Sequence, residues 1–240
     1  MKQIKLVVFD MAGTTIRDLG EVENCFFEAC QTTGLPAVSR KEINSFMGYP
    51  KRFVFEKLWA GQIGDRQHPS FQQNVLGSYD RFREILENHY RTHPVVPTEG
   101  AEATFAWLRS QGIRIALTTG FYRKVTDMLL EKLGWTVMDG VIDCSVASDE
   151  VSRGRPHPDL IFKAMHLLGI SHADQVICIG DTPSDIRSGR AAGCLLSLGV
   201  TNGSHAVDEL EQEENDGLLA SLRDFKPFVQ GALHETMRLA

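Results

Sequence analysis

Three aspartates have the type and spacing to bind a metal ion or to attack an electrophile. Asp10 follows the apolar run of residues 4–9, and Asp181 follows a similar run at residues 176–180. Such runs are typical of strands buried on both faces of a parallel sheet, and ligands of these sheets bind outside the carboxyl ends of the strands. Asp185 comes four residues after Asp181, so both can face one point. We expect the three carboxylates to share one crevice; the alternative for Asp10 and Asp181 is a helix cap.

Carboxylates that crowd together favour a hard divalent cation. Mg²⁺ takes oxygen ligands, keeps bound waters and bridges to the oxygens of a substrate phosphate. The sequence therefore predicts Mg²⁺ as the cofactor.

Glycines, hydroxyls and arginines at the same sheet edge could bind a phosphate. Gly13 lets main-chain amides approach an anion, and the strand at residues 114–117 ends in the TTG stretch of residues 118–120. The loop VSRGRPHPD carries Arg153 and Arg155, and an arginine can donate two parallel hydrogen bonds to a phosphate. Taken alone, the TTG stretch also fits a helix cap, and either arginine also fits a solvated charge.

Strand and helix patterns alternate along most of the chain, and this alternation would position these residues. It predicts a doubly wound parallel sheet of the α/β class. Helical patterns have apolar spacings of three and four residues and a closing glycine. The apolar runs expected to hold strands are residues 4–9, 112–120, 140–149, 175–181 and 194–200, and the helices between them are expected at 101–112, 122–134 and 158–169.

Residues 18–97 interrupt this alternation. The segment is too long for one crossover helix, and residues 51–61 and 71–90 have helical patterns. Prolines and a glycine at residues 93–100 discourage regular structure at its end. We expect a core domain of residues 1–17 and 98–240, and an inserted helical domain of residues 18–97.

The composition excludes several classes of protein. A hydrophobic content of 42% supports a full core, and a formal net charge of -6 gives no basic surface for nucleic acid. No apolar stretch reaches the ~20 residues of a membrane span, and no charged leader opens the chain, so we expect a soluble cytoplasmic protein. The five cysteines include no CxxC pair and fit reduced thiols better than disulfides or a zinc site.

The ordered motifs FDMAGTT, TTG, GRP and GDTPSD resemble those of the haloacid dehalogenase superfamily of phosphoryl-transfer hydrolases. This resemblance covers the whole chain and implies a Rossmann-like core with a helical cap at residues 18–97. It implies that Asp10 is a nucleophile that forms an aspartyl-phosphate, which water then hydrolyses. Thr119 would bind the phosphoryl group and Arg155 would pair with it. The residues assigned to Mg²⁺ are Asp10, Ala12, Asp181 and Asp185.

Ala12 stands where most phosphatases of this superfamily have an acid that protonates the leaving group. Losing a general acid costs ~10²–10⁴ in rate, so we expect a leaving group that does not need that proton. DMAGTT and the arginine of GRP resemble the phosphonatases, or phosphonoacetaldehyde hydrolases, which cleave a carbon–phosphorus bond. In that branch a cap lysine forms a Schiff base with the substrate aldehyde, and the protonated imine accepts the electrons left when phosphorus departs.

The stretch FMGYPK resembles the lysine motif of this branch and selects Lys51 over Lys41 and Lys57. As a nucleophile at neutral pH, Lys51 needs a depressed pKa, which burial against Met47 and other apolar residues could supply. A solvated surface position is the alternative. The residues assigned to substrate binding are Gly13, Thr14, Met47, Gly120 and Phe121.

The resemblance is incomplete around the substrate pocket. Val54 stands where phosphonatases have a histidine, and Phe121 stands where they have a tyrosine. A related carbonyl phosphonate therefore stays open as the substrate. Two other functions also stay open: a phosphatase for a phosphate ester or anhydride with a good leaving group, and a non-catalytic protein that binds Mg²⁺ and phosphate. The resemblance implies a small-molecule phosphonate or phosphate as the substrate. Resemblance to the phosphonatases, which pair through their caps, also implies a homodimer.

Overall fold

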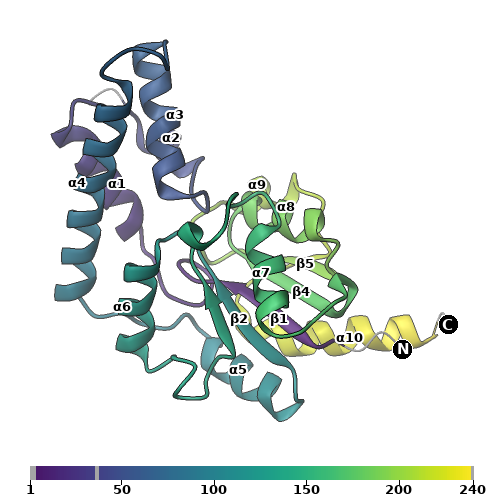
Figure 1. Cartoon of the computed structure of the whole chain (residues 1–240). Helices are drawn as coiled ribbons and strands as arrows, with labels where there is room; N and C mark the ends of the chain where they lie inside the picture. Colours follow the sequence, from purple (N-terminus) through teal and green to yellow (C-terminus); the bar gives the residue numbers. More distant parts are fainter. Residues whose placement is uncertain (1–3, 36–37, 239–240) are drawn as a thin grey trace.

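The protein is described by a computed structural model that covers residues 4–35 and 38–238. Within these residues six strands form one parallel sheet in the order β3-β2-β1-β4-β5-β6 (Figure 1). The strands are β1 (Leu6–Asp10), β2 (Arg114–Thr118), β3 (Cys144–Val146), β4 (Val176–Gly180), β5 (Leu196–Val200) and β6 (Gly217–Leu219). The predicted α/β class with a parallel, Rossmann-like sheet is confirmed.

β1 lies inside the sheet, between β2 and β4. The chain places β2 and β3 on one side of β1 and then returns to build β4, β5 and β6 on the other side. The strand order therefore reverses between β1 and β4. Open α/β sheets bind ligands at such a point, and Asp10 and Asp181 mark it because they end β1 and follow β4.

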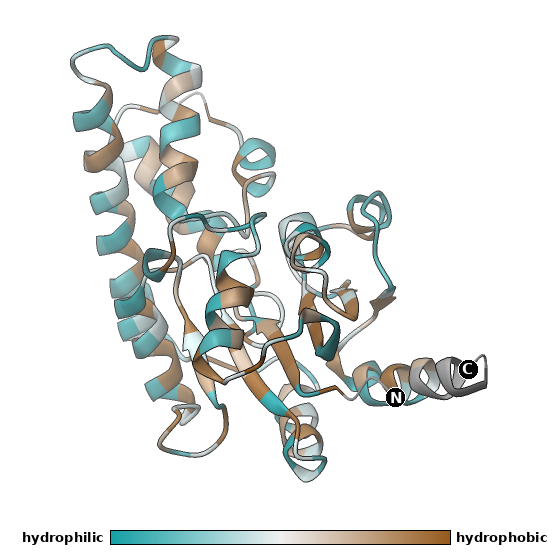
Figure 2. Ribbon diagram, turned by 45° about the vertical axis from the view of Figure 1, so that its right-hand side comes forward, coloured by the Kyte–Doolittle hydropathy of each residue, from teal (hydrophilic) through white to brown (hydrophobic). Residues whose placement is uncertain are grey.

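Helices cover both faces of the sheet, because successive side chains of β1 point to opposite sides. Val7 and Phe9 join one core, whereas Leu6 and Val8 join the other. Phe9 packs on Phe105, with ring centroids 5.3 Å apart. Figure 2 shows the strands as hydrophobic ribbons between these helices. The first face is covered by α5 (Ala101–Ser110), α6 (Arg123–Leu133) and α10 (Phe225–Arg238), and the second by α7 (Asp159–Leu167) and α8 (Pro183–Ala192).

Four helices form a separate bundle beside the carboxyl edge of the sheet, at the upper left of Figure 1. They are α1 (Glu21–Thr32), α2 (Arg40–Asn44), α3 (Lys51–Ile63) and α4 (Phe71–Thr92), and all fall within the predicted insertion of residues 18–97. Phe26 stacks on Phe82 at 4.1 Å between ring centroids and meets Phe55 at 5.1 Å. All three rings are fully buried, and each such burial stabilises the fold by about 1.5–3 kcal/mol. We call this bundle the cap.

The two chain segments that join cap and core lie side by side. Ile16 pairs with Pro97 in an antiparallel bridge, and the amide of Arg17 donates to the carbonyl of Val96 at 2.9 Å. The amide of Thr98 donates to the carbonyl of Thr15 at 2.9 Å. The insertion therefore leaves the core and returns to it at one place.

The structure differs from the sequence-based expectation at both edges of the sheet. Of the apolar run at 140–149 only Cys144–Val146 forms a strand, because the side chain of Asp143 already binds the amide of Ile115 and the chain turns into η1 (Ser148–Glu150). The acidic segment 207–217 gives α9 (Val207–Glu211), but its last residue, Gly217, begins β6. The remaining short helices are η2 (Ala173–Gln175) and η3 (Leu222–Asp224).

Two expectations from composition can be compared with the structure. All five cysteines are buried and none forms a disulfide. Among the helices in the described part of the chain, none combines the length and the apolar character needed to cross a lipid bilayer.

Candidate active site

The carboxyl ends of the central strands bring the predicted residues together. Asp10 is the last residue of β1 and lies opposite Thr118, the last residue of β2. Asp10 is 6% exposed, and Asp181 and Asp185 are fully buried. The sheet edge therefore concentrates three carboxylates in a space that excludes most water.

Arg155 ties two of these acids together. The buried guanidinium donates from Nη1 to Oδ1 of Asp10, and its Nε lies 2.8 Å from Oδ1 of Asp185. Its Nη2 donates to the hydroxyl of Thr118 at 2.6 Å. Arg155 is thus fixed beside Asp10, where its charge can neutralise a phosphoryl group.

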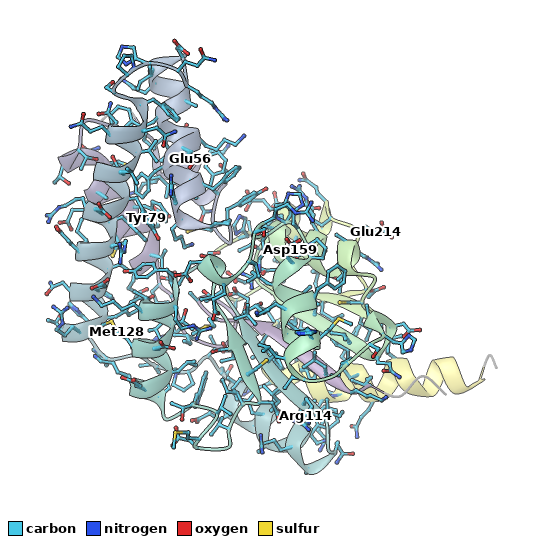
Figure 3. The ribbon with its side chains drawn as sticks, in the orientation of Figure 1. Glu56, Tyr79, Arg114, Met128, Asp159 and Glu214 are labelled. Atoms are coloured by element: carbon cyan, nitrogen blue, oxygen red, sulfur yellow. The ribbon has the colours of Figure 1, made fainter. Side chains whose placement is uncertain are left out.

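The structure separates the two candidate arginines. Arg153 is largely exposed and pairs with Asp159 at 3.1 Å, at the start of α7 (Asp159 is labelled in Figure 3). It belongs to the surface, so only Arg155 reaches the site.

Asp181 is held by the loop that follows β1 and by a second loop after β5. Oδ1 accepts the hydroxyl hydrogen of Thr14 at 3.0 Å, and Oδ2 accepts the amide and hydroxyl hydrogens of Ser204, both at 2.7 Å. Gly13 has a φ of 96°, and a Cβ at this residue would lie 2.2 Å from Oδ2 of Asp181. Only glycine allows this approach. Sequence reasoning missed Ser204, since a serine after β5 carries no motif.

Gly13 and Thr14 do not line the pocket to which they were assigned. They contact Asp181 instead, so in this structure they orient a carboxylate. Asp185 also has a partner for each oxygen: Oδ2 accepts the amide and the hydroxyl of Thr182, and Oδ1 faces Arg155. Asp181 and Asp185 thus both have hydrogen-bond partners on each carboxylate oxygen, but only Asp185 shares an oxygen with a charged group, Arg155.

Arg155 does not neutralise all three buried carboxylates, because one guanidinium faces three acids. Burial, followed by repulsion from Asp185 and Asp181, raises the pKa of Asp10 to about 8, although Arg155 acts in the opposite direction. Burial and then Asp185 also raise the pKa of Asp181. A protonated carboxyl group is a poor nucleophile, and a dication would return Asp10 to its ionised form.

Mg²⁺ fits this donor set. The carboxylates of Asp10 and Asp181 are hard oxygen ligands, and Ala12, which has no polar side-chain atom, can add its main-chain carbonyl. Across the described residues, no three His, Cys, Asp or Glu side chains converge into a ready ligand cluster. An ion here would complete its coordination with waters and substrate oxygens, as Mg²⁺ usually does.

Lys51 is the first residue of α3 and is buried, at 6% exposed. Gly48, with a φ of 82°, and Pro50 turn the chain into this helix. The ammonium group lies 5.3 Å from the ring centroid of Phe121 in the core and 5.6 Å from that of Phe26 in the cap. Lys57, two turns along, is exposed.

Burial lowers the pKa of Lys51 to about 8, although the carboxylates of Asp10 and Asp18 act in the opposite direction. Near neutral pH the uncharged form of this lysine is therefore a minor form, but far more populated than in a lysine of ordinary pKa. This is the form that attacks a carbonyl carbon.

One pocket between cap and core contains both Lys51 and Asp10. It leaves about 20 Å³ free, room for one or two water molecules. A Cβ on Gly120 would lie 2.7 Å from the carbonyl oxygen of Tyr49, which shows how tightly the two domains meet. The lining residues are Asp10, Ala12, Asp18, Val22, Met47, Gly48, Lys51, Thr119, Gly120, Phe121, Thr182 and Ser204.

The predicted substrate-binding residues Met47, Gly120 and Phe121, and the predicted phosphoryl-binding Thr119, thus share the pocket with Asp10. The hydroxyl oxygen of Thr119 accepts the amide of Phe121 at 3.1 Å, which leaves its hydrogen for a phosphoryl oxygen. Val54 is fully buried and joins the hydrophobic core without lining the pocket. Asp18, Thr182 and Ser204 are lining residues that were not predicted as site residues.

Comparison with known proteins identifies the family. Residues 7–197 match the model of the haloacid dehalogenase-like hydrolases. The chain belongs to this family. It is therefore a hydrolase, and the resemblance found in its motifs is confirmed.

Relatives and solved structures agree with this assignment. Phosphonoacetaldehyde hydrolase of Bacillus cereus strain AH187 is 31% identical over an alignment 256 positions long. The alignment covers 98% of this chain and 92% of that protein. A hydrolase from Pseudomonas syringae superposes with a TM-score of 0.81 at 18% identity, covering 95% of this chain and 98% of that one. A predicted phosphoglycolate phosphatase from Haemophilus somnus 129pt has a TM-score of 0.77 at 19% identity, covering 95% and 99%. The two solved structures support the fold.

Proposed function

We propose that this hydrolase cleaves the carbon–phosphorus bond of phosphonoacetaldehyde or a related carbonyl phosphonate. The observation that carries the proposal is a buried lysine facing the pocket of a buried aspartate, with Ala12 where a general acid would otherwise stand. The similarity to a relative named phosphonoacetaldehyde hydrolase supports the same reaction.

Lys51 would act first. Its uncharged amine adds to the carbonyl carbon, and loss of water leaves a protonated imine. Asp10 then attacks phosphorus, and the electron pair of the carbon–phosphorus bond moves into the imine to give an enamine. The rings of Phe26 and Phe121 beside Nζ favour the cationic imine. No proton has to reach the leaving carbon while the bond breaks, so Ala12 carries no penalty.

Asp10 would receive the phosphoryl group as an aspartyl-phosphate, which water hydrolyses. Arg155 is already placed on Oδ1 of Asp10, and Thr119 presents its hydroxyl in the same pocket. Mg²⁺ at the oxygens of Asp10, Ala12 and Asp181 would neutralise phosphoryl charge. The predicted homodimer and the cytoplasmic location stay predictions.

Sodium borohydride trapping tests the proposal. Borohydride reduces an imine to a stable amine, so incubation with phosphonoacetaldehyde should add mass to the peptide that contains Lys51 and inactivate the enzyme. The matched control is Lys57→Arg on the same helix, which should be labelled and inactivated like the wild type. If several carbonyl phosphonates leave every lysine unmodified, the imine mechanism is wrong.

A phosphatase with an activated substrate is the second candidate, favoured by the structural neighbour named as a phosphatase and by the apolar Val54. A leaving group that departs without a proton would also tolerate Ala12. Phosphate release from acyl phosphates or activated esters, combined with no release from carbonyl phosphonates, would favour this candidate.

Removal of divalent metal should abolish phosphate release from the substrate of either candidate. The reason is the raised pKa of Asp10, which without a dication leaves the nucleophile largely protonated at pH 7. The measurement is phosphate release after dialysis against EDTA, followed by a Mg²⁺ titration. Activity that persists after exhaustive dialysis contradicts the Mg²⁺ assignment.

A further inference from the structure

The pocket contains one titratable group that the mechanism above does not use. Three of its lining side chains titrate: Asp10, Lys51 and Asp18. In the proposed mechanism Asp10 attacks phosphorus and Lys51 adds to the carbonyl carbon. Asp18 is left, although imine formation needs an acid that removes the carbonyl oxygen as water.

Asp18 lies where the chain enters the cap, and it lines the pocket. It follows the segment that joins core and cap and precedes α1, and its Oδ1 accepts the amides of Gly20, Glu21 and Val22 at 3.0, 2.7 and 3.4 Å. All three hydrogen bonds end on Oδ1, so the second carboxyl oxygen takes no part in binding the first amides of α1. The bonds fix the carboxyl group beside the pocket.

Burial and the neighbouring Glu21 favour the protonated form of Asp18. Burial and then the adjacent Glu21 carboxylate raise the pKa of Asp18 to about 7. Burial would also raise the pKa of Glu21, but hydrogen bonding from Asp18 and from main-chain amides lowers it. Both effects favour Asp18 over Glu21 as the carboxyl group that carries the proton.

No other described group around the pocket is suited to act as the acid in imine formation. Val54, one helical turn after Lys51, is apolar and fully buried. Thr119, Thr182 and Ser204 offer hydroxyls, which are far weaker acids than a carboxyl group. Lys51 itself must be uncharged when it attacks.

We propose that Asp18 is the general acid that forms the imine at Lys51, which makes it a third catalytic residue of the proposed reaction. This inference rests on the proposed function. Nζ of Lys51 bonds to the carbonyl carbon and one of its protons moves to the oxygen, giving a carbinolamine. Asp18 protonates the hydroxyl, the carbon–oxygen bond breaks, and water leaves. The protonated imine and the Asp18 carboxylate then form an ion pair in the pocket.

The pH dependence of trapping follows from the two groups. Imine formation requires uncharged Lys51, so its rate rises as the pH increases toward about 8. It also requires protonated Asp18, so the rate falls as the pH passes above about 7. The groups that face Asp18 are Lys51 from α3, Glu21 and Cys25 from α1, and Tyr90 from α4. The profile should therefore be bell-shaped.

Asp18→Asn is the test. Asparagine keeps the oxygen that accepts the three amides and can still donate a hydrogen bond to Glu21, so the start of α1 is retained. Asparagine cannot act as an acid. The rate of borohydride trapping with phosphonoacetaldehyde should fall by ~10²–10⁴, and the basic limb of its pH profile should disappear. Binding of inorganic phosphate in the presence of Mg²⁺ should be unchanged, because Asp10 and Arg155 are untouched.

The matched control is Asp65→Asn, which replaces an exposed aspartate of the cap whose Oδ1 also accepts a main-chain amide. Its trapping rate should equal that of the wild type. If Asp18→Asn is trapped as fast as the wild type, or if the pH profile of the wild-type enzyme only rises, Asp18 is not the general acid. Either result would leave the imine mechanism standing. Absence of trapping in the wild-type enzyme overturns the proposed function itself.

Discussion

Lys51→Arg is expected to reduce phosphate release from phosphonoacetaldehyde by at least ~10³-fold. Arginine keeps the positive charge and much of the length of the side chain, but its guanidinium is always protonated and forms no imine with an aldehyde. The departing electron pair then has no acceptor. The measurement is the steady-state rate of phosphate release, with borohydride trapping as the second readout.

The control for this substitution lies on the same helix. Lys57 is exposed over the ring of Phe53, with Nζ 5.1 Å from its centroid, so Lys57→Arg makes the same chemical change outside the pocket. It should leave the rate unchanged. If Lys51→Arg retains carbonyl-phosphonate hydrolysis, the imine is excluded. If the variant instead retains activity on phosphate esters alone, the phosphatase function is favoured.

Asp10→Asn is expected to lower phosphate release from every substrate by at least ~10⁴-fold, because the amide cannot accept a phosphoryl group. This loss does not depend on whether the substrate is a phosphonate or a phosphate ester. Imine trapping at Lys51 should survive, since it precedes phosphoryl transfer. The two assays therefore separate the roles of the two residues.

The same variant provides its own control for folding. In the metal-free protein at pH 7, Asp10 is largely protonated when folded and ionised when unfolded, because folding raises its pKa to about 8. This difference lowers stability at pH values above the unfolded pKa. Asparagine does not ionise in either state, so Tm should rise. An inactive variant with a lowered Tm would indicate misfolding, and the exposed Asp139→Asn provides the reference.

The core of the fold was predictable because its strands are apolar runs followed by polar residues. β1, β2, β4 and β5 all lie in or next to the expected runs, since strands buried on both faces need continuous apolar sequence. β6 was missed because three residues carry too little pattern and follow a run of acids. β3 was predicted too long because apolar residues such as Val141 and Ile142 pack on the core without joining the ladder.

The site was predictable where a residue sits in a motif and was missed where only packing reveals it. Asp10, Thr119 and Arg155 follow strands or lie in a recognisable loop, and Lys51 was selected by the motif FMGYPK. Asp18 was not predicted as a site residue, because only the folded chain brings it to the pocket that Lys51 lines. Ser204 comes from a loop after β5, and only the folded chain shows that it binds Asp181.

The hydrogen-bonded segments at Ile16 and Pro97 bear on how this enzyme could change its substrate during evolution. Because the inserted bundle begins and ends at neighbouring points, exchanging it for another bundle would leave the strand order and the phosphoryl chemistry untouched. The proposed nucleophile, Asp10, would be inherited with the core and the proposed imine-forming residue, Lys51, with the cap. A lineage could therefore acquire carbon–phosphorus cleavage by recombination of a single gene segment.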